Sequence, residues 1–587
     1  MEEVGQLLLQ DENENPMESL MFVDAIQRVG VDHHFEEEIE MILGRQYNCN
    51  WSKSVCFHGL HDVSLFFRLL RQQGYYVSAD VFNNFKGKDG KFLEEVKQDV
   101  RGLMALYEAA QLSFHGETIL DEAQDFSSLH LSAYLHPNYE NENENLCCDD
   151  EDAIRNTLRH PQHKTIPRLT AKAFLHGDLL KGSKQWQKSL RELANMDFLI
   201  GKSTHQHELL QISKWWKDIG LAEELRNARN QPIKWYTGSM AILIHHPTLS
   251  SQRIELTKVI AFIHLLDDIF DLYGTIHQLT LFTHAINRWD HSAIDMLPSY
   301  MRMSYKALLD TTNQIANNIQ KRHGHNPIDY MKATWGSLCN AFLVEARWFA
   351  SSTGDHELPT TKEYLENGKV STGVHVVLVH LFFLLGLGGG TDDDDNEINL
   401  NHTSKLTSSI ATILRLWDDL GSSKWASLCE AFLVEARWFA FCVNPTSHVV
   451  LVHLFFLLGL GGLNHEINLD HTSKLSSSIA AILRLWDDFG SSKDEQQDGQ
   501  DGSYITCYMK DEPNVSVKQA RQHVVDMILN EWRNLNHECF RLNHFSASCF
   551  KRSSLNLARM VPLMYAYDEN QRLPLLEEYI RNTLFDD

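Results

Sequence analysis

Apolar residues recur at helical spacing along most of the chain, whereas strand-like alternation of apolar and polar residues is nearly absent. Helical spacing gathers apolar side chains on one face of each helix, where they can pack against other helices. Between Leu60 and Leu103 we expect several short helices that begin at Ser or Asp and end at Gly. We therefore predict an all-α fold. At 587 residues the chain is long enough for two domains, and its character changes near residue 200, where we place the boundary.

One predicted helix, Leu256–Gly274, carries acidic residues among its apolar ones. Asp267 and Asp271 are four residues apart, which places both carboxylates on one helix face, one turn from each other. Burying two acids in an apolar helix is costly unless a cation or a hydrogen-bond network meets them. Paired carboxylates suit Mg²⁺, which often bridges to the phosphates of a substrate. A solvated acidic patch at a helix end is the alternative interpretation of this segment alone.

Residues 335–424 and 425–493 carry nearly the same sequence twice, with no spacer between the two copies. The block 338–350 returns as 428–440 with one change, from Asn340 to Glu430. Solenoids need about three or more repeats, so two copies instead indicate a recent tandem duplication or an error in the gene model.

The two copies differ in their potential metal ligands. In the second copy Asp487, Ser491 and Glu495 fall at i, i+4 and i+8, which aligns three oxygen ligands on one helix face. In the first copy the third position is Ala426, so only the second copy carries the complete set. Arg484 lies three residues before Asp487 and could bind phosphate oxygens with two hydrogen bonds.

The copies also differ in length, because only the first holds the segment 363–371. We therefore expect a composite domain. In it, the first copy would supply residues 335 to about 400, and the second copy would supply the chain from about residue 464. The residues between these two parts would be displaced from the core, so deletion of residues 401–469 should not lower the soluble yield or the melting temperature.

Composition limits the class of protein and its compartment. The net charge of −25 argues against a nucleic-acid binder, which usually has a basic surface. The most apolar runs, 374–390 and 449–462, are shorter than the about 18 residues of a membrane span, so we expect core helices and no membrane partner. The ten cysteines form no CxxC pair and indicate reduced thiols. We expect a cytoplasmic protein, or a plastid protein if an N-terminal segment is missing from this chain.

We assign no catalytic or metal-binding role to two further motifs. His205 and His207 are two residues apart and would diverge on a helix, so we expect a surface pair rather than a metal site. The run Asp392–Asp395 contains the DxDD pattern of class II cyclases, but its glycine-flanked position favours a charged loop.

The two acidic motifs, Asp267–Asp271 and Asp487–Glu495, together resemble the metal-binding motifs of plant class I terpene synthases. The resemblance covers nearly the whole chain and includes residues 67–75 and 567–574. It implies an N-terminal α-barrel-like domain over residues 1–200 and a C-terminal catalytic helical bundle over residues 201–587. Within this family we expect the nearest resemblance to linalool and nerolidol synthases, which make acyclic tertiary alcohols. It lacks the Arg-Arg-x8-Trp motif of cyclising monoterpene synthases, and the family's Arg-x-Arg motif is reduced to Arg229-Asn230-Gln231.

The resemblance also implies the chemistry and the residues that carry it. Three Mg²⁺ ions, or Mn²⁺, would bridge to a prenyl diphosphate from five oxygen ligands, Asp267, Asp271, Asp487, Ser491 and Glu495. Arg229 and Arg484 would hold the phosphate oxygens while the carbon–oxygen bond ionises, and water would then capture the allylic cation. The product would be linalool from geranyl diphosphate or nerolidol from farnesyl diphosphate. Five aromatic residues are candidates for the wall of the cation pocket, although plain core packing explains each of them better: Tyr236, Phe270, Trp335, Tyr565 and Tyr567.

Alternatives remain open at this point. The family usually has a tryptophan nine residues after Arg229, where this chain has Gly238, so the pocket would gain volume. The enzyme could make another acyclic or cyclic product. A catalytically impaired or inactive relative would be consistent with Gly238 and the repeat. A chain-elongating prenyltransferase would share the fold but should carry a second DDxxD motif. We expect a monomer.

Overall fold

The computed structural model describes most of the chain outside the second copy of the repeat. Secondary structure in the described part is helical, apart from an isolated antiparallel bridge between Lys86 and Phe92, which confirms the all-α prediction. Arg484, Asp487, Ser491 and Glu495 lie outside the described residues. These are residues 1–14, 16–48, 59–135, 148–177, 184–243, 246–290, 294–350, 359–387, 404–422, 504–541, 548–565 and 573–585.

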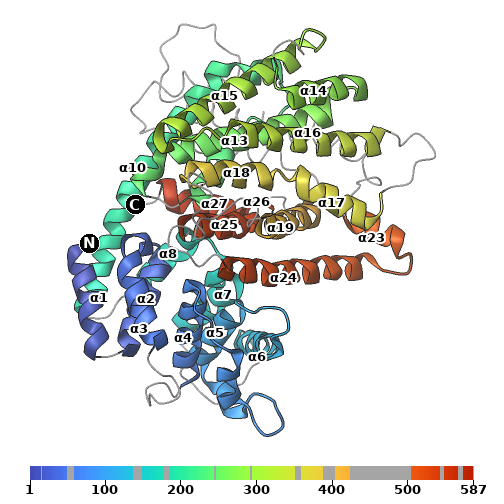
Figure 1. Ribbon diagram of the computed structural model, residues 1–587. Coiled ribbons are helices and arrows are strands. Elements are labelled where there is room, and N and C mark those ends of the chain that lie inside the picture. The colour runs from blue at the N-terminus through green and yellow to red at the C-terminus, as the bar shows by residue number, and fades with distance from the viewer. Residues whose placement is uncertain are drawn as a thin grey trace, which may run out of the picture.

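The N-terminal helices form one body with its own hydrophobic core (Figure 1). Two of the expected helix caps are present: Gly74 ends a helix in the left-handed conformation, with φ 103°, and the Asp99 carboxylate accepts a hydrogen bond from the Gly102 amide at 2.8 Å. The helices are α1 (Glu2–Glu14), α2 (Pro16–Val29), α3 (Glu36–Asn48), α4 (Leu60–Gln73), α5 (Val100–Ala110), α6 (Thr118–Tyr134), α7 (Cys148–Arg159) and α8 (Pro167–His176), with 3₁₀ turns η1 (Asp32–His34), η2 (Ala79–Phe85), η3 (Glu94–Gln98) and η4 (Gln162–Lys164).

A single long helix, α10 (Gln185–Ile219), crosses the domain boundary that we predict near residue 200. Its first half contributes residues up to Ala194 to the N-terminal core, whereas Trp216 near its end belongs to the largest core of the molecule. Figure 1 shows it running from the N-terminal body along the side of the C-terminal helices. The helix therefore joins the two cores, and the exact division into domains stays a prediction.

The C-terminal helices enclose α13 (Ser250–Asp268), which packs against α10, α12, α15 and α18. The other elements are α11 (Leu221–Glu224), α12 (Pro232–Ile242), η5 (Pro247–Leu249), η6 (Ile269–Tyr273), α14 (Ile276–Arg288), α15 (Ser299–His323), α16 (Ile328–Ala350), α17 (Thr361–Ser371), α18 (Val374–Leu384), α19 (Ser404–Ser422), α23 (Tyr504–Asp511), α24 (Val517–Arg541), α25 (Ser548–Arg559), α26 (Val561–Tyr565), α27 (Pro574–Ile580) and η11 (Arg581–Phe585).

The helix α18 belongs to the most apolar part of the described chain. By length and composition the stretch Thr361–Leu384 could cross a membrane, but 67% of its most apolar window is buried inside the molecule. Gly373, with φ +70°, divides the stretch into α17 and α18. Burial against other helices is the behaviour of a core helix, as we predict for residues 374–390. The second run, 449–462, lies outside the described residues.

The helix α19 comes from the first copy of the repeat and lies in the C-terminal core. Ile410, Ile413 and Leu416 are fully buried, and the helix packs against α17, α24 and α26. The expectation that residues 401–469 are displaced is therefore wrong for residues 404–422. The same apolar pattern recurs in the second copy, so the pattern could not indicate which copy packs here.

Candidate active site

The predicted acidic helix is present, but its last turn is not regular. The α-helix α13 ends at Asp268 and continues as the π-helical turn η6, which contains Asp271. A π turn adds one residue to the helical repeat, and such turns are frequent at functional sites. Asp267 therefore belongs to the last α-helical turn and Asp271 to the π turn that follows it. Phe270, between them, packs in the core with its ring centroid 5.6 Å from that of Phe342.

Arg229, in the segment before α12, closes over this acidic end of α13. Its Nε donates to Asp268 Oδ1 at 2.7 Å, and its backbone amide donates to Asp268 Oδ2 at 2.7 Å. Its Nη2 donates to Asp267 Oδ2 and to the carbonyl of His264, the latter at 3.2 Å. The structure thus brings Arg229 and Asp267 together in an ion pair. Asp268, which sequence reasoning left out, holds Arg229 in position.

The carboxylates at this end of α13 have unusual proton affinities. Burial raises the pKa of Asp268 to about 6, even though the Arg229 guanidinium beside it acts in the opposite direction. Desolvation by the surrounding helices and the nearby charge of Asp267 raise the pKa of Asp271 above its ordinary value, although part of the residue is exposed to solvent. Burial is the main cause of both shifts, and the charge of Asp267 adds to them, so both carboxylates bind protons more readily than exposed ones.

A second wall of the site comes from α16, α17 and α19. Glu345 on α16 contributes negative charge at Asp271, and it accepts a hydrogen bond from Ser371 Oγ at 2.7 Å. Arg415 Nη2 lies 3.6 Å from Glu345 Oε1, and the Arg415 guanidinium lies 4.5 Å from the centroid of the Tyr364 ring. Arg415 also donates to the Tyr364 hydroxyl. The site thus contains four carboxylates, three from the end of α13 and one from Glu345. Two arginines, Arg229 and Arg415, lie beside them.

Arg415 is a site residue that sequence reasoning missed. It stands 69 positions before Arg484 and is the equivalent residue of the first copy. The repeat itself was the signal that could have identified it. In the same helix Asp418 and Ser422 are the first-copy equivalents of Asp487 and Ser491. The structure thus brings a first-copy arginine to the wall that faces α13.

The surplus of carboxylates fits a bound cation. Oxygen atoms of Asp and Glu are the ligands that Mg²⁺ prefers, and a divalent ion would offset the repulsion that raises the Asp271 pKa. The donor set on α13 therefore suits the metal that the sequence predicts.

The remaining predicted residues lie apart from this cluster or within the core. Trp335 is buried beside His380, with ring centroids 5.6 Å apart. Tyr565 ends α26 and is partly buried against the core, and Tyr567 lies outside the described residues. Gly238 on α12 faces α13, because a Cβ atom there would lie 3.4 Å from Ile260 Cδ1.

The prediction of a surface histidine pair is wrong for His205. His205 is fully buried, and its Nδ1 lies 2.7 Å from the hydroxyl of Tyr236, whereas His207 is exposed. The two side chains do diverge, as their spacing requires. Burial of His205 follows from the packing of α10 against α12, which a two-residue spacing does not reveal.

Comparisons with known proteins agree with this architecture. The model of the terpene synthase family metal binding domain matches residues 217–426 and 422–534, and the model of the terpene synthase N-terminal domain matches residues 1–154. A crystal structure of isoprene synthase from grey poplar leaves, in complex with three Mg²⁺ ions and dimethylallyl-S-thiolodiphosphate, superposes with a TM-score of 0.76. It is 27% identical in sequence, and the match covers 100% of this chain and 96% of that one.

Curated relatives cover nearly the whole chain. A chloroplastic tricyclene synthase of Antirrhinum majus is 48% identical, over 99% of this chain and 85% of its own length. An (E)-nerolidol synthase of Cannabis sativa is 40% identical, over 97% and 88%. The chloroplastic S-(+)-linalool synthase of Arabidopsis thaliana is 39% identical, over 97% and 84%.

These relatives correct two expectations and establish the family. The expectation that linalool and nerolidol synthases are the most similar members is wrong, because the tricyclene synthase is 48% identical and those two enzymes are 40% and 39% identical. The expected cytoplasmic location is wrong, because the Antirrhinum majus and Arabidopsis thaliana relatives are chloroplastic proteins. The family models match both halves of the chain, and several relatives exceed 30% identity over almost its full length. The chain therefore belongs to the terpene synthase family, whose members are lyases that act on prenyl diphosphates.

Proposed function

We propose that this enzyme ionises a prenyl diphosphate with the help of three Mg²⁺ ions, for which Mn²⁺ could substitute. The observation that supports this proposal is the carboxylate-rich end of α13, where Asp267, Asp268 and Asp271 face one arginine, Arg229, among the residues that the structure describes. Asp267 and Asp271 would hold metal, together with Asp487, Ser491 and Glu495. When bound, the ions would neutralise charge on the diphosphate leaving group. Asp268 would keep Arg229 oriented toward the phosphate oxygens.

The proposed product is an acyclic tertiary alcohol. Similarity to an (E)-nerolidol synthase and to an S-(+)-linalool synthase supports this product, as does the single arginine in Arg229-Asn230-Gln231. The higher identity to a tricyclene synthase favours a second candidate, a cyclic hydrocarbon. Both candidates require the same ionisation and differ only in the fate of the allylic cation.

The compartment bears on the choice of substrate. We propose a plastid location, which the chloroplastic relatives support, and it removes the argument that cytosolic farnesyl diphosphate favours nerolidol. Geranyl diphosphate, and hence linalool, becomes the preferred substrate and product, with farnesyl diphosphate as the runner-up. The monomer and the division into residues 1–200 and 201–587 stay predictions, which size-exclusion chromatography with light scattering and limited proteolysis would test.

We further propose that the repeated block arose by tandem duplication, and that one of the two equivalent arginines serves the site. The position of Arg415 beside Glu345 supports the first copy, whereas Glu495 supports the second. Activity lost in Arg415→Ala but kept in Arg484→Ala would assign the phosphate-binding arginine to the first copy. The opposite pattern would assign it to the second copy and contradict the position of α19.

The central experiment is incubation of the purified protein with Mg²⁺ and either geranyl or farnesyl diphosphate, followed by mass spectrometry of the volatile products. An acyclic alcohol that disappears in Glu495→Ala and in Asp271→Asn would support the proposal. A tricyclic hydrocarbon would favour the second candidate. Folded protein that forms no product from either substrate would contradict both candidates and indicate a catalytically impaired member of the family.

A further inference from the structure

Histidine side chains gather around a carboxylate where the N-terminal helices meet the long helix α10. His33 and His34 belong to the turn η1, which joins α2 to α3, and Asp197 lies within α10. The rings of the two histidines have centroids 4.0 Å apart. The ring of His246, from the segment before η5, packs against them at interplanar angles of 80° and 64°. The cluster therefore unites three segments that are distant in the sequence.

Three of these residues bring their ligand atoms close enough to share one metal ion. One nitrogen each from His33 and His34 and one oxygen from Asp197 lie within 4.8 Å of one another. Asp197 Oδ1 lies 3.0 Å from His34 Nε2 and 3.9 Å from His33 Nε2. In a tetrahedral zinc site, whose bonds are about 2.0–2.2 Å long, the ligand atoms are about 3.3 Å apart. The two separations lie on either side of this value, so small rotations of the side chains would close the site around an ion.

The His33 imidazole offers a ligand atom that the protein does not otherwise use. Its side chain is 3% exposed, and its Nε2 has no hydrogen-bond partner among the described residues. Burying a polar atom without a partner is costly, and a bond to a metal ion would remove that cost. The side chains of His34 and Asp197 are each 14% exposed, so an ion can reach the cluster from solvent.

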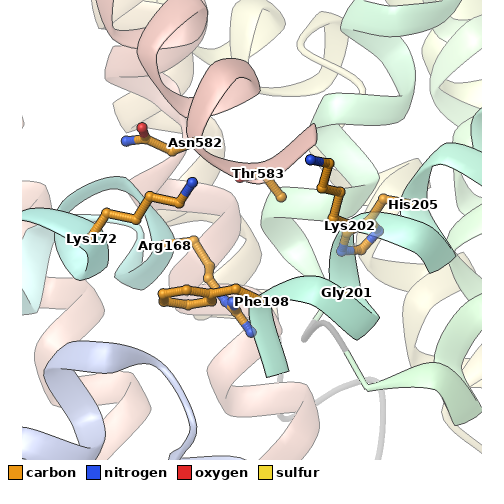
Figure 2. A pocket seen from close by; sticks show the side chains of 8 residues that line it. All are labelled: Arg168, Lys172, Phe198, Gly201, Lys202, His205, Asn582 and Thr583. Carbon is orange, nitrogen blue, oxygen red and sulfur yellow. The ribbon is translucent and has the colours of Figure 1, made fainter. Parts of the chain in front are cut away.

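Arg168 on α8 holds the other oxygen of Asp197. Its Nη2 donates to Asp197 Oδ2, which leaves Oδ1 facing the histidines. The Arg168 guanidinium lies 4.3 Å from the centroid of the Phe198 ring, and Figure 2 shows the two side chains packed together. Carboxylates that bind metal are commonly oriented by a second hydrogen bond of this kind.

The charge of Arg168 also determines which metal the cluster suits. It offsets the charge of Asp197, so imidazole nitrogen must supply most of the affinity for a cation. Mg²⁺ and Ca²⁺ prefer oxygen ligands, whereas imidazole suits zinc and related transition metals. The donor set of two imidazoles and one carboxylate therefore differs from the carboxylates at the end of α13.

We propose that His33, His34 and Asp197 bind one divalent ion of the zinc class, at a site separate from the proposed Mg²⁺ site on α13. A water molecule would complete the tetrahedron. His246 packs against both ligand rings and limits their rotation. Because the ligands come from η1 and α10, a bound ion would fasten the turn between α2 and α3 to the long helix. The site is thus structural rather than catalytic.

The test is calorimetric titration of the metal-free full chain with zinc chloride in a buffer that contains excess Mg²⁺. Mg²⁺ occupies sites built from oxygen ligands but competes poorly for imidazole. We expect one tightly bound zinc ion per chain. His34→Ala should lose at least about tenfold in affinity, since loss of even an outer partner of a ligand costs about that much. His207→Ala, at an exposed histidine on α10, is the matched control and should leave the affinity unchanged.

Further measurements separate metal binding from an effect on folding. Co²⁺ bound in place of zinc should give the strong visible absorption of a four-coordinate ion in the wild type and in His207→Ala, but not in His34→Ala. Zinc should raise the melting temperature of the wild type but not that of His34→Ala. If His34→Ala does not fold, His34→Gln, which preserves a polar side chain, makes the same comparison.

The proposed Mg²⁺ site provides the remaining control. Asp271→Asn should bind zinc as tightly as the wild type does, because Asp271 does not belong to the histidine cluster. The proposal is wrong if the wild type binds no zinc in excess Mg²⁺, or if the folded His34 variant binds zinc as the wild type does. Loss of zinc binding in Asp271→Asn would also overturn it, since the ion would then belong to α13.

Discussion

The two ends of α13 carry the same kinds of charged residue in different proportions. Near its start, Arg253 forms two hydrogen bonds with Glu208, from Nε at 2.9 Å and from Nη2 at 2.6 Å, and both side chains are fully buried. Tyr236 donates to the same carboxylate at 2.7 Å and lies 2.7 Å from His205 Nδ1. At the other end, three aspartates share Arg229, and part of the cluster is exposed to solvent.

The difference teaches how to tell a structural ion pair from a binding site within one helix. One arginine and one glutamate with their hydrogen bonds satisfied leave nothing for a ligand to bind. Among the described residues, three carboxylates with one arginine leave negative charge that a bound cation would balance. Charge balance and access to solvent, rather than residue type, separate the two ends.

Breaking the charge-balanced pair of Arg253 and Glu208 near the start of α13 should have the largest effect on stability. Glu208→Gln leaves Arg253 buried without a counter-charge, so we expect a loss of about 3–5 kcal/mol in the free energy of unfolding, measured by urea denaturation. Asp290→Asn, which breaks an exposed pair with Arg288, should cost at most about 1 kcal/mol. A double variant Glu208→Gln/Arg253→Met should lose less than Glu208→Gln alone. Equal losses in Glu208→Gln and Asp290→Asn would contradict the comparison.

A substitution in the aspartate cluster at the other end of α13 should instead affect catalysis. Asp271→Asn removes a proposed metal ligand, and we expect kcat/KM to fall roughly 10²- to 10³-fold, the loss seen when one group that stabilises transition-state charge is removed. The melting temperature without metal should not fall, because the substitution relieves repulsion from Asp267. Asp310→Asn, at an exposed position of α15, serves as control. A variant that keeps full activity would remove Asp271 from the site.

A third prediction concerns acid pH at the balanced end. Burial, followed by the charges of Arg253 and Arg168, holds the pKa of His205 well below its ordinary value. Buried His163 and His380 behave alike, with pKa values of about 3 and about 4. Since the unfolded chain binds protons first, stability is complete above about pH 6.5 and falls as the pH falls.

Between pH 6.5 and pH 5 the loss should approach about 2 kcal/mol for each such histidine. His205→Gln should therefore lose less stability than the wild type over this interval, which urea denaturation at the two pH values would measure. An identical pH dependence in both proteins would show that His205 does not titrate as its burial requires.

We expect the smallest effect on stability and activity from a substitution on α12 that faces the middle of α13. Gly238 is in the middle of α12, and an added Cβ would lie 3.4 Å from Ile260 Cδ1, the end of a flexible side chain. Gly238→Ala should change the free energy of unfolding by no more than about 1 kcal/mol, because helix propensity favours alanine while the contact opposes it. Activity should stay within a few-fold of the wild type in the volatile-product assay. A large loss of activity with unchanged stability would place Gly238 in the substrate pocket.

Much of the fold and part of the site followed from sequence periodicity. Local spacing determined the all-α class, the helix over 256–274 and the pairing of Asp267 with Asp271, because each depends on residues within a few turns. Arg229 was identified by the resemblance to terpene synthases, although its partner Asp268 went unnoticed. That omission has a physical cause, since the two residues are 39 positions apart and meet only through the packing of α12 against α13.

Only the tertiary structure decided several other features. The two copies of the repeat have the same apolar pattern, so their sequences could not determine that α19 of the first copy enters the core or that Arg415 reaches Glu345. His205 is buried because α10 packs against α12. Periodicity by itself determined which helices form and which residues share a face. Which helices become neighbours depends on long-range packing, because segments that are distant in the sequence compete for the same core.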